Sequence, residues 1–133
     1  MNIVQSEEKA FVQAFIVDSK RERYLTMLAN PKKRTKILGL LYHNLDTIPA
    51  KAFAIANRDH NPVSVEKLLR QKGAGDFCYL ISPETEFDQQ QMPLREALDM
   101  LITQDSTGIA CCLSGRLAYY KAELQQYILE NIN

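Results

Sequence analysis

The stretch that decides the expected fold is residues 109–120, which read IACCLSGRLAYY. Two apolar runs flank Ser114-Gly115, and glycine supplies the positive φ that a tight turn between antiparallel strands requires. We therefore expect a β-hairpin of strands 109–113 and 117–121.

The two adjacent cysteines of the hairpin should point to opposite faces of the sheet, because side chains alternate along a strand. Pairing then sets Cys111 opposite Ala118 and Cys112 opposite Leu117, with Leu113 on the face of Cys111. Both faces carry apolar groups, which indicates a sheet covered by helices on both sides. A catalytic thiol needs exposure and a lowered pKa, so buried packing is the favoured interpretation of both cysteines.

The segments before and after the hairpin complete the C-terminal part, residues 73–133. Residues 76–82, DFCYLIS, are typical of a buried strand, and Pro93 begins an apolar helical pattern. A strand, helix, strand crossover in one sheet is almost always parallel, so strand 76–82 should pair in parallel with strand 109–113. An amphipathic helix is expected over residues 122–131. This part is thus predicted as β-α-β-β-α with a three-stranded mixed sheet.

The N-terminal part, residues 1–72, is predicted to be all helical. One long helix should run from about residue 6 to 29, capped by Ser6, and a second from Pro31 to about residue 44, folded back as a hairpin. Residues 47–57 favour a short helix over a strand, and Ser64 should cap a helix that runs to Lys72. The expected fold class is α+β, in a single domain over residues 1–133.

The composition is that of an ordinary folded domain, with 133 residues of which 46% are hydrophobic and 24% charged. The first residues lack the pattern of a secretory signal, and no apolar run approaches the ~18 residues of a membrane span. The three cysteines lie in apolar runs, without a CxxC motif, and there are two histidines. We therefore expect a cytoplasmic protein with reduced thiols, no membrane partner, no metal site and no cofactor.

The net charge of zero hides a strong asymmetry between the two parts of the chain. Residues 1–72 hold thirteen Lys and Arg against seven Asp and Glu, whereas residues 73–133 hold three against nine. A basic segment at residues 20–36 is the first candidate surface for an anionic partner. Its candidate binding residues are Lys20, Arg21, Arg23, Lys32, Lys33, Arg34 and Lys36.

A second candidate lies where the strands were expected to end. Ligands of parallel α/β sheets bind beyond the carboxyl ends of the strands, which would bring the loop after strand 76–82 beside the turn at 114–116. The candidate residues of this strand-end edge are Ser82, Glu84, Glu86, Asp88, Ser114 and Arg116. Carboxylates there could bind a cation or act as an acid–base pair, but a solvated acidic loop is the favoured interpretation, because the spacing lacks the glycine of a calcium loop.

The functional expectation follows mainly from what the sequence lacks. It contains no glycine-rich nucleotide motif and no Gly-x-Ser-x-Gly elbow. We expect a non-catalytic protein-interaction or regulatory module whose partner is another protein or a second copy of the chain. Nucleic-acid binding through residues 20–36 is an alternative, which the zero net charge opposes. A small enzyme or ligand-binding protein that uses the strand-end carboxylates is a second alternative.

Overall fold

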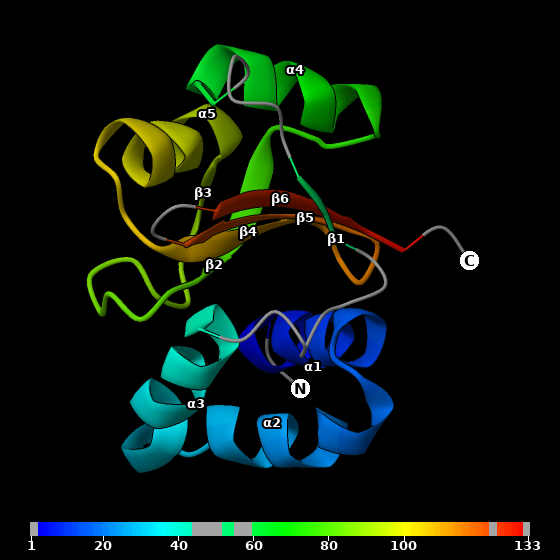
Figure 1. The fold of residues 1–133 in the computed structure, drawn as a ribbon, viewed down its shortest axis with the longest axis vertical. Coiled ribbons are helices and arrows are strands. Elements are labelled where there is room, and N and C mark those ends of the chain that lie inside the picture. The colour runs from blue at the N-terminus through cyan, green and yellow to red at the C-terminus, as the bar shows by residue number, and fades with distance from the viewer. Residues whose placement is uncertain (1–2, 44–51, 55–59, 123–124, 132–133) are drawn as a thin grey trace.

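The protein is built as a sheet between two helical layers (Figure 1). The structure, a computed structural model, describes residues 3–43, 52–54, 60–122 and 125–131. Its sheet has six strands in the order β1-β6-β5-β4-β2-β3, and all neighbours are antiparallel. The strands are β1 (Ala52–Ala54), β2 (Phe77–Ile81), β3 (Gln91–Pro93), β4 (Gly108–Leu113), β5 (Leu117–Ala122) and β6 (Gln125–Glu130). The α+β class is confirmed, and the three-stranded mixed sheet is wrong.

The helices cover both faces of the sheet, as expected. One layer contains α1 (Ile3–Phe15), a 3₁₀ turn (Asp18–Lys20), α2 (Arg21–Leu28) and α3 (Pro31–His43). The other contains α4 (Pro62–Gln71) and α5 (Leu94–Leu98), which continues as a π-helical turn (Asp99–Thr103). Two buried apolar clusters fill the spaces between the sheet and these layers.

The single long helix expected over residues 6–29 is wrong, because the chain turns at Val17, whose φ of −58° and ψ of 143° are extended. A straight helix of that length would span about 36 Å, whereas a six-residue strand spans about 20 Å. The turn lets both α1 and α2 pack within the area of the sheet, burying Phe15 and Tyr24 in one cluster. Ser6 consequently lies inside α1 and not at its start.

Two further expectations for the N-terminal part need correction. Residues 52–54 form β1, which pairs with β6 from Ala52 opposite Leu129 to Ala54 opposite Tyr127. Pairing at the sheet edge thus overrides the helix propensity of alanine, and the rest of the segment 47–57 lies outside the described residues. Helix α4 begins at Pro62, where the Asn61 side chain caps it by accepting a hydrogen bond from the Ser64 backbone at 2.9 Å.

The parallel pairing of strands 76–82 and 109–113 is also wrong. These strands are neighbours, but β2 and β4 are antiparallel, with Tyr79 opposite Cys111 and Ile81 opposite Ile109. The reason is β3, which forms in the segment that was expected to be an acidic loop. β3 pairs antiparallel with β2, so the chain has already reversed its direction before α5 begins. The crossover rule therefore applies to β3 and β4, which run in the same direction on either side of β2.

The C-terminal helix expected over residues 122–131 is replaced by β6, which pairs with β5 from Leu117 opposite Glu130 to Ala122 opposite Gln125. Ile128 and Leu129 pack into different clusters, because adjacent side chains of a strand point to opposite faces and both faces of the sheet are covered. A short apolar run of this kind resembles a helix face in sequence, which explains the error.

The hairpin of β4 and β5 matches the expectation except at one position. Gly115 has a φ of +69° in the turn, and Cys111 lies opposite Ala118. The register then shifts so that Leu113, not Cys112, lies opposite Leu117. This bulge turns Leu113 to the α4–α5 side together with Cys112, whereas Cys111 faces the α1–α3 side.

Candidate functional site

A buried ion network at Arg34 joins α3 to α1 and to the loop after β2. The guanidinium donates to both Glu8 oxygens, with Nη1–Oε1 at 2.7 Å and Nη2–Oε2 at 2.6 Å. It also donates to both Asp88 oxygens, with Nε–Oδ2 at 2.6 Å and Nη2–Oδ1 at 2.9 Å. The Leu28 carbonyl accepts the remaining hydrogen bond, from Nη1 at 3.1 Å. All five N–H groups of the guanidinium are thus used.

Further contacts orient the two carboxylates. The Tyr79 hydroxyl donates to Glu8 Oε2 at 2.7 Å, and the Ser82 backbone donates to Asp88 Oδ1 at 3.0 Å. Burial, followed by the hydrogen bond to Glu8, raises the pKa of Tyr79, so its hydroxyl is a donor at neutral pH. Burial alone would lower the pKa of Arg34, but the hydrogen bonds and charges of Asp88 and Glu8 outweigh this and raise it. The network is a fully satisfied structural link with no spare donor for a ligand.

The network takes one residue from each of the two candidate sites, Arg34 from the basic segment and Asp88 from the strand-end edge. Sequence reasoning missed the two other members, Glu8 and Tyr79, although a signal was present. Arg34 lies three, four and seven residues before Ile37, Leu38 and Leu41, and Glu8 precedes Phe11, Val12 and Phe15 with the same spacing. Both charged residues therefore occupy the apolar stripe of a helix, which predicts that they are buried as a pair.

The other basic candidates remain on the surface of the α2–α3 hairpin. Arg21 pairs with Asp18 and also donates from Nε to the Ile16 carbonyl at 2.9 Å. The remaining five are Lys20, Arg23, Lys32, Lys33 and Lys36, which we call the basic surface. Lys20 is half-buried and the others are exposed. No ion pair joins any of these five side chains to another residue of the described ranges.

An apolar side chain extends the basic surface along α3. Leu40 follows Lys36 by four residues and Lys33 by seven, so the three share one side of the helix. Leu40 is 41% exposed and is one of three large hydrophobic side chains on the described surface. This side of α3 thus combines two positive charges with an apolar side chain that can exclude water from a contact with a partner.

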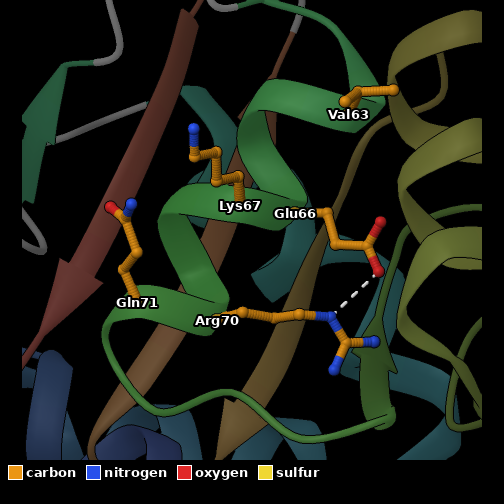
Figure 2. A pocket seen from close by; sticks show the side chains of 5 residues that line it. All are labelled: Val63, Glu66, Lys67, Arg70 and Gln71. Carbon is orange, nitrogen blue, oxygen red and sulfur yellow. Dashed lines mark hydrogen bonds and ion pairs between the residues drawn. The ribbon is translucent and has the colours of Figure 1, made fainter.

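The α4–α5 layer has a different electrostatic character, because its two arginines are paired with carboxylates. Arg70 contacts Glu66 and Asp76, each at 3.0 Å, and Arg95 contacts Glu66 at 3.4 Å and Asp99 at 3.2 Å. An open depression of about 610 Å³ lies here, and Figure 2 shows its lining on one side of α4, with Glu66 and Arg70 joined. Its lining residues are Val63, Glu66, Lys67, Arg70 and Gln71. An anionic ligand that bound Arg70 there would have to compete with Glu66 and Asp76.

The strand-end edge is not assembled as expected. Because β2 and β4 are antiparallel, the loop after β2 lies beside the start of β4, where Ser82 Oγ donates to the Thr107 carbonyl at 2.7 Å and Glu84 accepts from the Thr107 backbone at 3.1 Å. Ser114 and Arg116 lie in the turn at the other end of β4. Glu86 is exposed in the same loop as Glu84. The carboxylates and the guanidinium of the proposed edge are therefore separated by the length of a strand.

The cysteines have the environment of packing groups. Burial raises the pKa of Cys78 to about 12 and also raises the pKa of Cys111 and Cys112, which keeps all three as thiols at neutral pH. Within residues 3–43, 52–54, 60–122 and 125–131, no three His, Cys, Asp or Glu side chains gather where they could hold a metal ion. No helix in the described ranges is long and apolar enough to cross a membrane.

The fold and the site together define a three-layer α+β protein with a basic helical surface whose five cations make no ion pair within the described residues. In comparisons with known proteins, no family model, curated protein or solved structure matches the chain.

Proposed function

We propose that the protein is a non-catalytic interaction module that binds an acidic segment of a partner protein through the basic surface and Leu40. The observation that carries this proposal is the contrast between the two helical layers. Arginines of the α4–α5 layer are paired with carboxylates, whereas five cations of the α2–α3 hairpin have no counter-charge in the described ranges. Because these cations make no ion pair within the described part of the chain, an anionic partner offers a reason for their clustering.

The strength of such an interaction can be bounded. Each exposed ion pair contributes between 0 and about 1 kcal/mol, so five pairs contribute at most about 5 kcal/mol. Screening over a Debye length of about 8 Å at physiological salt lowers this further. Charge alone therefore supports weak, fast association, and burial of Leu40 would supply the rest.

A protein partner is favoured over nucleic acid by the position of the acidic loop. The ion pair between Arg34 and Asp88 holds that loop, with exposed Glu84 and Glu86, against α3. A polyanion that lay along the hairpin would approach these carboxylates and be repelled. A short, flexible acidic segment of a protein can bind the hairpin without reaching this loop, whereas a stiff duplex extends past it, which is why we place nucleic-acid binding second.

The proposal can be tested by fluorescence anisotropy with two labelled probes, a peptide of repeated Glu-Glu-Leu units and a 20-base-pair DNA duplex. The test variant is Lys32→Glu/Lys36→Glu. Its matched control is Lys67→Glu/Arg116→Glu, which makes the same change in net charge at exposed positions away from the α2–α3 hairpin. We expect the peptide to bind the wild type and the control, and binding to the test variant to fall by about tenfold or more.

The Leu40→Asn variant separates the apolar contact from the charges, because it removes the apolar side chain and adds no charge. It should weaken binding of the Glu-Glu-Leu peptide and leave the weaker binding of an oligo-glutamate peptide nearly unchanged. Equal binding of the acidic peptide to test variant and control would contradict the proposal. Tight DNA binding that is lost in the test variant would replace it with the nucleic-acid alternative.

A further inference from the structure

Two of the three cysteines occupy facing positions on neighbouring strands. In the β2–β4 pair, the register ends with Tyr79 opposite Cys111, and one further step along both strands reaches Cys78 and Cys112. Both side chains belong to the cluster on the α4–α5 side of the sheet, whereas Cys111 belongs to the cluster on the other side. Among the three cysteines, only Cys78 and Cys112 therefore share a face.

The hydrogen-bond pattern gives the type of this cross-strand position. Leu80 directs both backbone groups toward β3, since its N–H donates to Gln90 at 2.8 Å and its carbonyl accepts from Gln89 at 2.9 Å. Backbone groups alternate along a strand, so the groups of Tyr79 and Ile81 point toward β4 and those of Cys78 point away from it. One step beyond the last paired residues, Cys78 and Cys112 consequently fall at a non-hydrogen-bonded position of this register.

This position suits a disulfide. The Cα atoms of a non-hydrogen-bonded antiparallel pair are about 4.5 Å apart, within the range of about 4.4 to 6.8 Å found in disulfides. The two residues also differ in exposure, because Cys112 is half-buried beside the bulge and Cys78 is 3% exposed. Cys112 is therefore the sulfur that an oxidant reaches first, and Cys78 the one that completes the bond.

We propose that Cys78 and Cys112 are a redox modification site, which a low-molecular-weight disulfide converts to a cross-strand disulfide between β2 and β4. The Cys112 sulfur, as thiolate, attacks one sulfur of the oxidant, forms a mixed disulfide and releases the first thiol, which takes up the proton that Cys112 gave to solvent. The Cys78 thiolate then attacks the Cys112 sulfur, and the second thiol leaves with the proton from Cys78. The protein loses two protons and two electrons, and the oxidant becomes two thiols.

The site should react slowly, because burial holds both sulfurs as thiols. Once the mixed disulfide forms, however, the second step joins two groups already in position and should be fast. The glutathione adduct of Cys112 is then a transient species in the wild type.

The test is incubation of the native protein with oxidised glutathione, followed by blocking of free thiols, trypsin digestion and mass spectrometry. Cleavage after Lys72, Arg95 and Arg116 gives peptides 73–95 and 96–116, which a disulfide to Cys78 would join. Cys111 and Cys112 share the second peptide, so two matched variants assign the bond. Cys111→Ala should form the joined peptide as the wild type does, and Cys112→Ala should form at least about tenfold less.

The Cys78→Ala variant should stop at a glutathione adduct on peptide 96–116, and dithiothreitol should reverse every product. Far-UV circular dichroism checks that each variant is folded, and Cys112→Ser replaces Cys112→Ala if the alanine variant is not. A wild type that stays reduced, that stops at the adduct, or that forms the joined peptide equally well without Cys112 would overturn the proposal.

Discussion

Replacement of Arg34 by methionine should lower the free energy of unfolding by about 3 to 5 kcal/mol, the usual cost of removing one partner from a buried ion pair. Methionine keeps most of the volume of the side chain but removes five hydrogen bonds. The Glu8 and Asp88 side chains, 8% and 13% exposed, are left without their cation. The predicted loss is a large part of the roughly 5 to 15 kcal/mol that stabilise an ordinary domain.

The range can be compared with a sum over contacts. Four hydrogen bonds between charged groups at about 1.5 to 3 kcal/mol each would give about 6 to 12 kcal/mol. That sum is an upper bound, because in the variant the carboxylates recover part of the lost energy from water or by taking up a proton. Arg34→Lys, with three donors in place of five, should lose less than Arg34→Met.

Urea unfolding followed by far-UV circular dichroism measures the effect. With a slope of about 2 kcal/mol/M, the midpoint of Arg34→Met should fall by about 2 M. Lys33→Met, at the exposed neighbouring position, is the control and should change stability by less than about 0.5 kcal/mol. Adding Glu8→Gln and Asp88→Asn to Arg34→Met should restore part of the loss, since no unpaired charge then remains buried. A loss below about 1 kcal/mol in Arg34→Met would refute the reasoning.

Three further predictions concern single contacts. Lys121 lowers the pKa of Asp105 through a hydrogen bond and through its charge. At a pH above the ordinary pKa of 3.8 this ion pair therefore stabilises the fold, and the stabilisation is lost as the pH falls below the lowered pKa. Asp105→Asn should therefore melt below the wild type at pH 7, with a difference that shrinks in acid; a constant difference would contradict this. Burial raises the pKa of Glu7, whose Oε2 has no hydrogen-bond partner among the described residues. Glu7→Gln should therefore raise the melting temperature at pH 7 and give no gain at a pH well below the ordinary pKa of 4.5. Asn61→Ala should lose about 1 kcal/mol in urea unfolding through loss of the helix cap, and Ser64→Ala should lose less; the reverse order would restore Ser64 as the cap.

Local patterns in the sequence predicted the elements whose partners are close along the chain. The β4–β5 hairpin, the strand at 77–81 and α3 follow from turn residues, apolar runs and Pro31. The direction of β2 against β4 was wrong because β3 has three residues, too few for a visible alternation. β1 and β6 were read as helices because each is a strand only through its neighbours in the sheet.

The candidate site shows the same limit. The basic segment was visible as a run of charge, yet Arg34 differs from Lys33 because it faces the sheet, where Glu8 and Asp88 meet it from 26 and 54 residues away. Arg116 and Glu84 are separated because β2 and β4 are antiparallel. The crossover rule was applied to β2 and β4, whereas it holds for β3 and β4. Contacts between residues so far apart in the sequence depend on the order and direction of the strands, which local periodicity does not predict.

The sheet ends on both sides in strands of three residues, β1 and β3, and β3 closes with Pro93, which has no backbone N–H. Short edges and a terminal proline offer a poor template for the strand of another molecule. The apolar strands β4 and β5 are therefore shielded from self-association while the sheet is intact. Aggregation should then depend on the fraction of unfolded chains, and variants that weaken the fold should become insoluble in the order in which they lose stability.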